Sequence, residues 1–341
     1  MVRRGLSLLF LVFIGFLSKA QDIHFTQFFF SPLNLNPAYT GAFDGDWRAV
    51  GNHRSQWGAV VDQQFITSGL SYDQNIDIYG HLVAAGINFV HDQSSIGVLQ
   101  QNKLQLNGSY RKKIAGHTFG GGIQFGLIHK GIDYNKYTYP DQYNDDPYTG
   151  GNFDNSLANN QNFVTNNIYL FDFSLGLMWQ KSLTEKITPT VGFTLFHLNT
   201  PRESFLGNDN KLPIRKVFDV SVNYQFKPRL RLIPKILFMH HTNAQELVWG
   251  GLARYLVSTN KYGLYDVFAG FSSRNGFNRT YDSFTLVVGG VVKEWQLGIS
   301  YDINASELSS VSHYRGAFEL SLIYIAKNTK SKVVNVPCDR L

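Results

Sequence analysis

Carboxylate and histidine side chains are the groups in this 341-residue chain that could bind a metal ion. Asp141, Asp145 and Asp146 offer the oxygen ligands that Ca²⁺ prefers, but the glycine and closing glutamate of a calcium loop do not follow them. His240 and His241 are adjacent, so on a strand they would point to opposite faces and could not bind one ion together. The sequence therefore predicts no metal site, and calcium at the three aspartates is the alternative.

Catalytic signatures are also missing from the sequence. Gly120-Gly121-Gly122 is not followed by the Lys-Ser/Thr pair of a phosphate-binding loop and falls within an expected strand, where glycine eases curvature or close packing. No Gly-x-Ser-x-Gly nucleophile elbow occurs. Cys338 is the single cysteine and cannot form a disulfide within the chain. We therefore expect a protein that is not an enzyme and that uses no cofactor.

Alternation of apolar and polar residues is much more widespread than any of these motifs. Because a strand's side chains change faces at every residue, each alternating segment has one apolar and one polar face. Segments of about ten such residues match a transmembrane β-barrel that is apolar outside and polar inside. Ser174, on the polar face, is accordingly expected to accept an arginine better than its neighbour Phe173. The apolar face of one such segment carries Phe171, Phe173, Leu175, Leu177 and Trp179.

The fold class that this pattern predicts is all-β, an antiparallel outer-membrane barrel of about 14 strands. The barrel is expected within residues 47–327. The expected strands span residues 47–54, 65–74, 81–92, 101–113, 117–130, 169–182, 187–198, 215–226, 230–242, 246–257, 263–274, 282–293, 294–304 and 315–326.

The lengths of the connections support the same architecture. Longer loops, at residues 131–168, 199–214 and 305–314, follow odd-numbered strands. Outer-membrane barrels place short turns in the periplasm and long loops outside, so both termini are predicted to be periplasmic. A soluble sandwich, the alternative fold, has no reason to segregate loop lengths in this way. The short turns follow even-numbered strands, at residues 114–116, 183–185, 227–229, 258–260 and 293–294.

The N-terminal residues 1–20 have the three parts of a secretory signal peptide. Arg3 and Arg4 precede an apolar run, and small residues around Lys19 form a cleavage site before Gln21. The run is shorter than the ~20 residues of a membrane-spanning helix, which disfavours an anchor helix. Residues 21–46 are expected to form an irregular segment at the periplasmic mouth, and residues 328–341 a periplasmic tail.

Charge and aromatic content bear on the partners. The net charge of +6 includes Arg3, Arg4 and Lys19 of the signal peptide, and no basic cluster exists, so no nucleic-acid partner is expected. Membrane lipid is the expected surrounding of the barrel. Aromatic residues near the expected strand ends suit girdles at the two membrane interfaces. These aromatics are Tyr72, Tyr110, Trp179, Tyr224, Trp295 and Tyr324.

The loop of residues 131–168 is the candidate binding segment. Long loops are usually functional, and tyrosine and asparagine give adaptable contact surfaces. A solvated loop without a binding role is the alternative. The candidate contacts to a partner are Tyr134, Tyr137, Tyr139, Tyr143 and Tyr148.

Two short motifs carry a resemblance to a known family. The first lies in residues 27–41 and the second is Arg54-Ser55-Gln56-Trp57. Together they resemble the PorP/SprF family of the Bacteroidetes type IX secretion system, although Ser31-Pro32 replaces the family's frequent Asn-Pro. The residues that match the family pattern most clearly are Asn36, Pro37, Ala38, Tyr39, Gly41, Arg54, Gln56 and Trp57.

The resemblance implies an outer-membrane barrel that works with other type IX secretion components. It also implies a secreted surface protein as partner, such as a gliding adhesin, which is exported or anchored through its C-terminal sorting domain. The alternative function is an outer-membrane channel or transporter for small or hydrophobic solutes, because a barrel of this size can be open or plugged. The lumen-facing residues expected from the pattern, Gln105, Asn107, Asp172 and Asp219, suit either reading. A lipid-modifying enzyme is a third reading, for which the sequence offers no catalytic residues.

Overall fold

The computed structural model describes residues 25–58, 64–79, 81–94, 98–133, 138–146, 151–154, 156–157, 164–242, 244–258, 264–276, 281–307 and 309–326. The expected signal peptide, the C-terminal tail and Cys338 lie outside these residues, so the predictions about them stay predictions. None of the helices in the described residues is long and apolar enough to cross a membrane.

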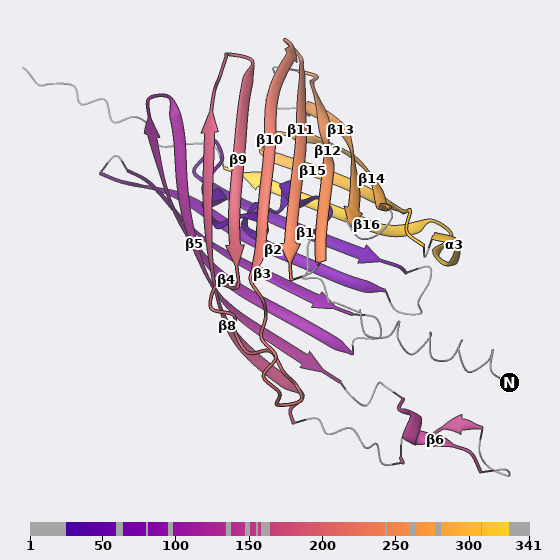
Figure 1. Cartoon of the computed structure of the whole chain (residues 1–341). Helices are drawn as coiled ribbons and strands as arrows, with labels where there is room; N and C mark the ends of the chain where they lie inside the picture. The colour runs from indigo at the N-terminus through magenta and orange to yellow at the C-terminus, as the bar shows by residue number, and fades with distance from the viewer. Residues whose placement is uncertain are drawn as a thin grey trace, which may run out of the picture.

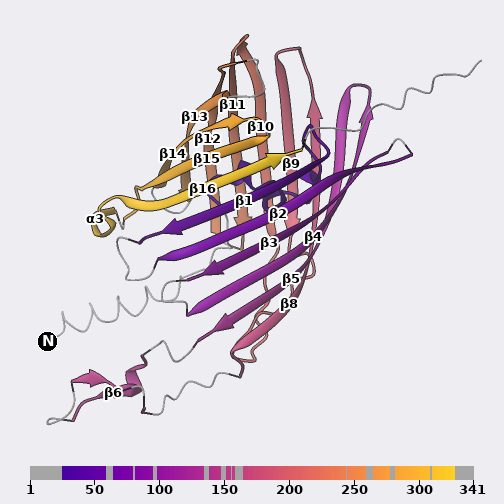
Figure 2. The same ribbon diagram turned by 180° about the vertical axis from the view of Figure 1, so that it is seen from behind.

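Fourteen antiparallel strands close into a barrel, as the sequence predicts (Figures 1 and 2). Consecutive strands pair throughout, and β1 pairs with β16 to close the ring. The barrel strands are β1 (Trp47–Gln56), β2 (Phe65–Ile78), β3 (His81–Gln93), β4 (Leu99–Ile114), β5 (His117–Ile132), β8 (Asn167–Lys181), β9 (Ile187–Phe196), β10 (Arg215–Lys227), β11 (Leu230–His241), β12 (Ala244–Leu256), β13 (Leu264–Gly276), β14 (Tyr281–Val292), β15 (Trp295–Asn304) and β16 (Arg315–Ile325).

The largest difference from the expected strand boundaries is at β2, which continues to Ile78 instead of ending at residue 74. Residues 75–78 still alternate polar and apolar, and they pair with the start of β3, where Ile78 lies opposite His81. A second difference is a small separate hairpin, β6 (Tyr143–Asn144) with β7 (Asn152–Phe153), in the loop between β5 and β8. In Figure 1 this hairpin lies apart from the barrel wall.

The connections divide the barrel into two unlike ends. We call the end with residues 79–80, 115–116, 182–186, 228–229, 257–263 and 293–294 the short-turn end, and the opposite end the long-loop end. The longest connection, between β5 and β8, and that between β9 and β10 both lie at the long-loop end. The division by length is not complete: at the long-loop end the connections of residues 94–98, 242–243 and 277–280 are short, and at the short-turn end the connection of residues 257–263 is longer than these.

The outward face of the wall is apolar, as the alternation predicts. Leu70, Phe171 and Leu177 are 65%, 60% and 61% exposed, although they are large hydrophobic residues. Their chain neighbours point inward, and Asp172 and Ser174 are buried. A band of exposed apolar side chains is the surface that contact with lipid requires. Closure of the barrel also pairs every strand edge, so that no strand edge is open to lipid.

The predicted girdle aromatics all lie toward one end of the barrel. Tyr110 and Trp179 are near the last residues of β4 and β8, and Trp295 begins β15, so each lies toward the short-turn end. Tyr72, Tyr224 and Tyr324 lie in the same half of their strands. The expectation of two girdles from these residues is therefore corrected to one, at the short-turn end.

A belt of polar side chains crosses the outward face nearer the long-loop end, on β1 to β8. His53 Nδ1 lies 3.0 Å from Ser68 Oγ, and His91 Nδ1 lies 2.8 Å from Asn102 Oδ1. These histidines are joined to neutral side chains and not to each other. The belt is formed by His53, Ser68, His91, Asn102, His129 and Asn167.

Candidate functional site

The N-terminal residues 25–41 lie inside the barrel and form what we call the plug. It consists of three short helices: η2 (Phe28–Phe30), α2 (Pro32–Leu35) and η3 (Pro37–Tyr39). Pro32 and Pro37 begin the last two, where proline's missing N–H costs nothing and its fixed φ favours the helix. Asn36 Oδ1 accepts a hydrogen bond from Ala38 N at 2.8 Å and caps η3.

The plug extends through much of the length of the lumen. Phe25 lies beside Val90 and Arg215, toward the long-loop end. Gly41 lies beside Ala84 and Arg111, toward the short-turn end. The sequence places residues 21–46 at the mouth of the barrel, whereas the described part of this segment reaches well into its interior.

Asn36, Pro37 and Ala38 are held against the middle of the wall. Asn36 Nδ2 donates to the carbonyl of Leu177 on β8 at 2.9 Å. A Cβ at Gly122 on β5 would overlap the backbone of Pro37 and Ala38, and one at Gly176 on β8 would overlap the Asn36 side chain. Because both positions are glycine, the plug can lie directly against the backbone of the wall. This accounts for Gly122 in the Gly120-Gly121-Gly122 run.

Tyr39 joins the plug to β10, two strands away from β8 in the wall. Its hydroxyl donates to Asp219 Oδ1 on β10 at 2.5 Å. Burial raises the pKa of Tyr39, and the negative charge of Asp219 raises it further. The phenol therefore stays protonated and remains a hydrogen-bond donor to the carboxylate.

Gly41 ends the plug at a buried ion pair. Its amide donates to Asp73 Oδ2 at 2.7 Å, and Arg48 binds both oxygens of the same carboxylate at 3.0 and 2.7 Å. Gly41 has φ +68°, a left-handed conformation that favours glycine, and a Cβ there would overlap Ala84. The motif glycine is thus required both by its backbone conformation and by its surroundings.

The second motif binds the beginning of the plug. Arg54 forms ion pairs with Asp302 at 3.1 Å and with Glu319 at 3.5 Å. The Glu319 carboxylate accepts hydrogen bonds from the backbone amides of Thr26 and Gln27 at 2.8 and 3.0 Å. Arg54 therefore offsets part of the negative charge of the two acids that bind the plug, and both family motifs serve the same structure.

The other residues of the second motif lie beside Arg54. Gln56 Oε1 accepts a hydrogen bond from Arg54 at 3.3 Å, which helps to orient the guanidinium. Trp57 ends the strand with φ 59° and packs edge-on against Phe65, with ring centroids 5.4 Å apart. Trp57 thus supports the turn of the chain away from β1.

The wall that faces the plug is polar on one side and apolar on the other. On β3 to β5, Gln105 links Asn88 and Gln124 by hydrogen bonds of 2.8 Å, and Gln124 also donates to Leu33 O of the plug. The expected lumen residues Gln105, Asn107, Asp172 and Asp219 are all buried on the inner face. On the apolar side, Phe28, Leu35 and Phe30 pack in two clusters against Phe196, Val217, Leu237, Met239, Val248, Val50, Leu252, Phe268, Val287 and Ile323.

The apolar side corrects the expectation of a uniformly polar interior. Inward residues on β9 to β14 behave as a hydrophobic core because the plug, and not water, covers them. Two cavities beside the plug have volumes of only about 20 and 10 Å³. At these places the lumen is occupied by protein, with room for little more than a water molecule.

Two of the five candidate tyrosines lie in the described residues. Tyr139 precedes a short helix, η6 (Pro140–Gln142), and its amide donates to Gln142 Oε1 at 3.2 Å. Tyr143 packs against Phe153 across the β6–β7 hairpin, with ring centroids 5.2 Å apart. The structure therefore gives these two residues an ordered setting. Tyr134, Tyr137 and Tyr148 lie outside the described residues.

Metal ligands do not gather in the described part of the chain: no group of three or more His, Cys, Asp or Glu side chains there could hold an ion. Sequence reasoning missed the residues that hold the plug, notably Arg48, Asp73, Asp302 and Glu319. The alternation places them on the inner face, but the contacts that they make depend on barrel closure.

These features define a membrane-type β-barrel whose lumen is filled by its own N-terminal segment. Residues 17–324 match the family described as "Type IX secretion system membrane protein PorP/SprF", and the chain belongs to this family. The predicted family is thereby confirmed. No curated protein matches the chain.

Solved structures share the fold at low identity. A monoaromatic hydrocarbon channel, the TodX deltaS2S3 mutant, is 12% identical with a TM-score of 0.52, and the match covers 86% of this chain and 93% of that one. The toluene transporter TbuX of Ralstonia pickettii is 12% identical with a TM-score of 0.46, over 84% and 90% of the two chains. The first likeness shows a common barrel fold and nothing about ligands.

Proposed function

We propose that this protein is an outer-membrane barrel of the type IX secretion and gliding system that acts by binding and not by catalysis. It binds, helps to export or anchors a secreted surface protein through that protein's C-terminal sorting domain. Other type IX components are its further partners. Family membership supports a role in type IX secretion. The occupied lumen is the observation that favours binding of a partner protein over conduction of solutes.

The occupied lumen argues for binding because, among the described residues, the plug packs against the wall and the two cavities beside it are too small for a solute. The plug donates backbone hydrogen bonds to the wall near both of its own ends, to Glu319 and to Asp73, and between them it packs against apolar wall residues. The exposed connections at the long-loop end, including the β6–β7 hairpin, are then the available recognition surface.

The surface proteome tests this function. Cells that lack the protein should lose one secreted protein with a type IX sorting domain from their surface, and expression of the wild-type barrel should restore it. An unchanged surface proteome in cells without the protein would overturn the proposal.

Transport of small or hydrophobic solutes is the second candidate. It is favoured by the hydrocarbon channels among the structures that share the fold. For this protein it would require the plug to move. Single-channel recording on the purified barrel separates the two: a closed barrel favours binding, and steady conductance or solute uptake favours transport.

A further inference from the structure

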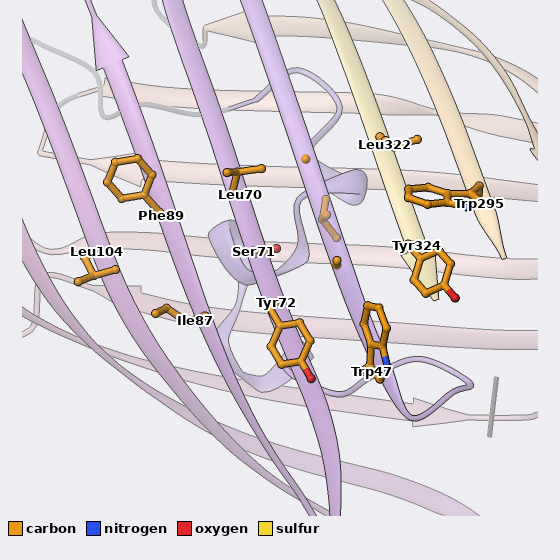
Figure 3. Close-up of a pocket in the computed structure, with 13 residues that line it drawn as sticks. Trp47, Leu70, Ser71, Tyr72, Ile87, Phe89, Leu104, Trp295, Leu322 and Tyr324 are labelled. Carbon is orange, nitrogen blue, oxygen red and sulfur yellow. The ribbon is translucent and has the colours of Figure 1, made fainter. Parts of the chain in front are cut away.

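A hollow on the outward face of the barrel, which we call the outer trough, has a volume of about 500 Å³ (Figure 3). It extends over β1 to β4 and over β15 and β16. Its floor is β1 at Ala49 and Gly51, and its walls include Leu70, Phe89 and Leu322. Of the described residues that line it, none is charged.

The hollow exists because β1 presents small residues where its neighbours present large ones. Gly51 lies between Leu70 of β2 and Leu322 of β16 in the ladder. Ala49 lies in the same way between Tyr72 and Tyr324. The backbone of β1 therefore forms a low strip between two ridges of apolar side chains.

One end of the trough is closed by an aromatic cluster with polar atoms. Trp47 lies between Tyr72 and Tyr324, with ring centroids 5.6 and 4.9 Å away, and Tyr324 also contacts Trp295 at 4.8 Å. In Figure 3 the hydroxyls of Tyr72 and Tyr324 point away from the apolar walls, toward the same side. Aromatic residues with such polar tips favour the membrane–water boundary.

We propose that the outer trough binds a glycerophospholipid from the leaflet at the short-turn end. One acyl chain lies along Ala49 and Gly51 between the apolar walls, and the glycerol phosphate lies beside Trp47, Tyr72 and Tyr324. The indole N–H of Trp47 and the hydroxyl of Tyr324 can donate to phosphate and ester oxygens, whereas the Tyr72 hydroxyl already donates to Gln74 Oε1 at 3.0 Å and offers its oxygen as an acceptor.

An acyl chain fits this trough better than the alternatives. The trough faces hydrocarbon, so an occupant must be apolar along most of its length and polar only at the aromatic end, which is the chemistry of a phospholipid. An unfilled hollow would lose dispersion contacts along its whole lining. A second copy of this barrel related by a two-fold axis at the trough would bring trough against trough and enlarge the hollow instead of filling it.

Filling the trough tests the proposal. A Cβ at Gly51 would lie 3.6 Å from Leu70 Cδ2, an ordinary contact, so Gly51→Leu should fold while occupying the acyl position. Gly121→Leu is the matched control, because Gly121 also faces outward and a Cβ there meets no atom within 4 Å. Ala49→Leu is a second test variant, and heat-modifiable migration in gels reports folding of each protein.

The measurement is native mass spectrometry of the purified barrels after addition of palmitoyl-oleoyl phosphatidylethanolamine. Wild type and Gly121→Leu should retain one lipid. The folded trough variants should retain it about tenfold less, since each displaced methylene lowers affinity several-fold. Equal retention by all barrels, or none by wild type, would overturn the proposal. So would a protein-sized adduct at a photo-crosslinker placed at Leu70 in cells, which would show a protein in the trough.

Discussion

At the residue scale, small groups of side chains hold the plug. The Arg48–Asp73 pair is nearly inaccessible to solvent and binds the amide of Gly41. Arg54, Asp302 and Glu319 do the same for Thr26 and Gln27. A buried charge is tolerated only while its partners satisfy it, so each group is sensitive to the loss of one member.

Replacing Asp73 should loosen the plug. Asp73→Ala leaves Arg48 buried without its main partner, and loss of one member of a buried pair costs about 3–5 kcal/mol. We expect a lower denaturant midpoint and faster proteolysis of the plug. Glu185→Ala, at an exposed position in the connection between β8 and β9, is the control and should change neither. Equal proteolysis of both variants would argue against a role for Asp73 in holding the plug.

Phe173 and Ser174 are neighbours with opposite surroundings. Phe173→Arg should impair assembly, because arginine on the lipid face costs about 2–4 kcal/mol near the bilayer centre. Ser174→Arg, expected from the sequence to be better tolerated than Phe173→Arg, should also fail, since Ser174 is fully buried in the occupied interior. Ser174→Ala should assemble normally. The amount of heat-modifiable protein measures the folding of all three variants. Efficient folding of Ser174→Arg would mean that the plug moves easily to make room for the arginine.

At the element scale, the plug and the long loop have separate roles. The plug packs against almost the whole circumference of the inner wall, from β3 to β16. The loop between β5 and β8 carries its own small hairpin, outside the barrel sheet. Each element can therefore be perturbed without changing the other.

Displacing the plug should open the lumen. A side chain at Gly176 would overlap Asn36, so Gly176→Leu should push η3 from the wall. We expect wild type to be closed in planar bilayers and Gly176→Leu to conduct. Gly121→Leu, which points outward, should behave as wild type. A closed Gly176→Leu barrel would show that the plug accommodates the leucine without leaving the lumen.

Removing most of loop 131–168 should abolish capture of the secreted partner while leaving a folded barrel. Loop-closure entropy depends only weakly on length, so β5 and β8 should still pair. Tyrosine-rich surfaces tend to anchor interfaces, and Tyr139 and Tyr143 would be lost with the loop. Pull-downs at equal surface levels measure the effect. Undiminished recovery of the partner would place recognition on other connections.

At the scale of the whole molecule, the barrel wall presents two unlike parts to a common plug. The polar part on β3 to β8 binds it by hydrogen bonds, and the apolar part on β9 to β14, together with Val50 of β1 and Ile323 of β16, buries its phenylalanines. Barrel and plug therefore form one packed unit. Export and membrane insertion must deliver both together.

The processed protein should begin at Gln21 and stay in the membrane fraction. The basic start, the apolar run and the small residues before Gln21 predict cleavage there. Mass spectrometry of the purified protein measures its first residue, and fractionation measures its location. A retained Met1 or a soluble processed protein would contradict this expectation.

The sequence by itself determined the strands and which of their residues face outward or inward. It could do so because alternation is a local pattern, in which two neighbouring residues of opposite polarity point to opposite faces of the strand. Through the family motifs it also identified Asn36, Gly41 and Arg54, but it did not show what these residues do. Only the tertiary structure decided that these residues hold a plug, because Arg54 on β1 meets Glu319 on β16 through closure of the ring. The same holds for Val217 and Leu237. Alternation marks them as inward, but only the presence of Phe28 and Leu35 in the lumen makes them a core.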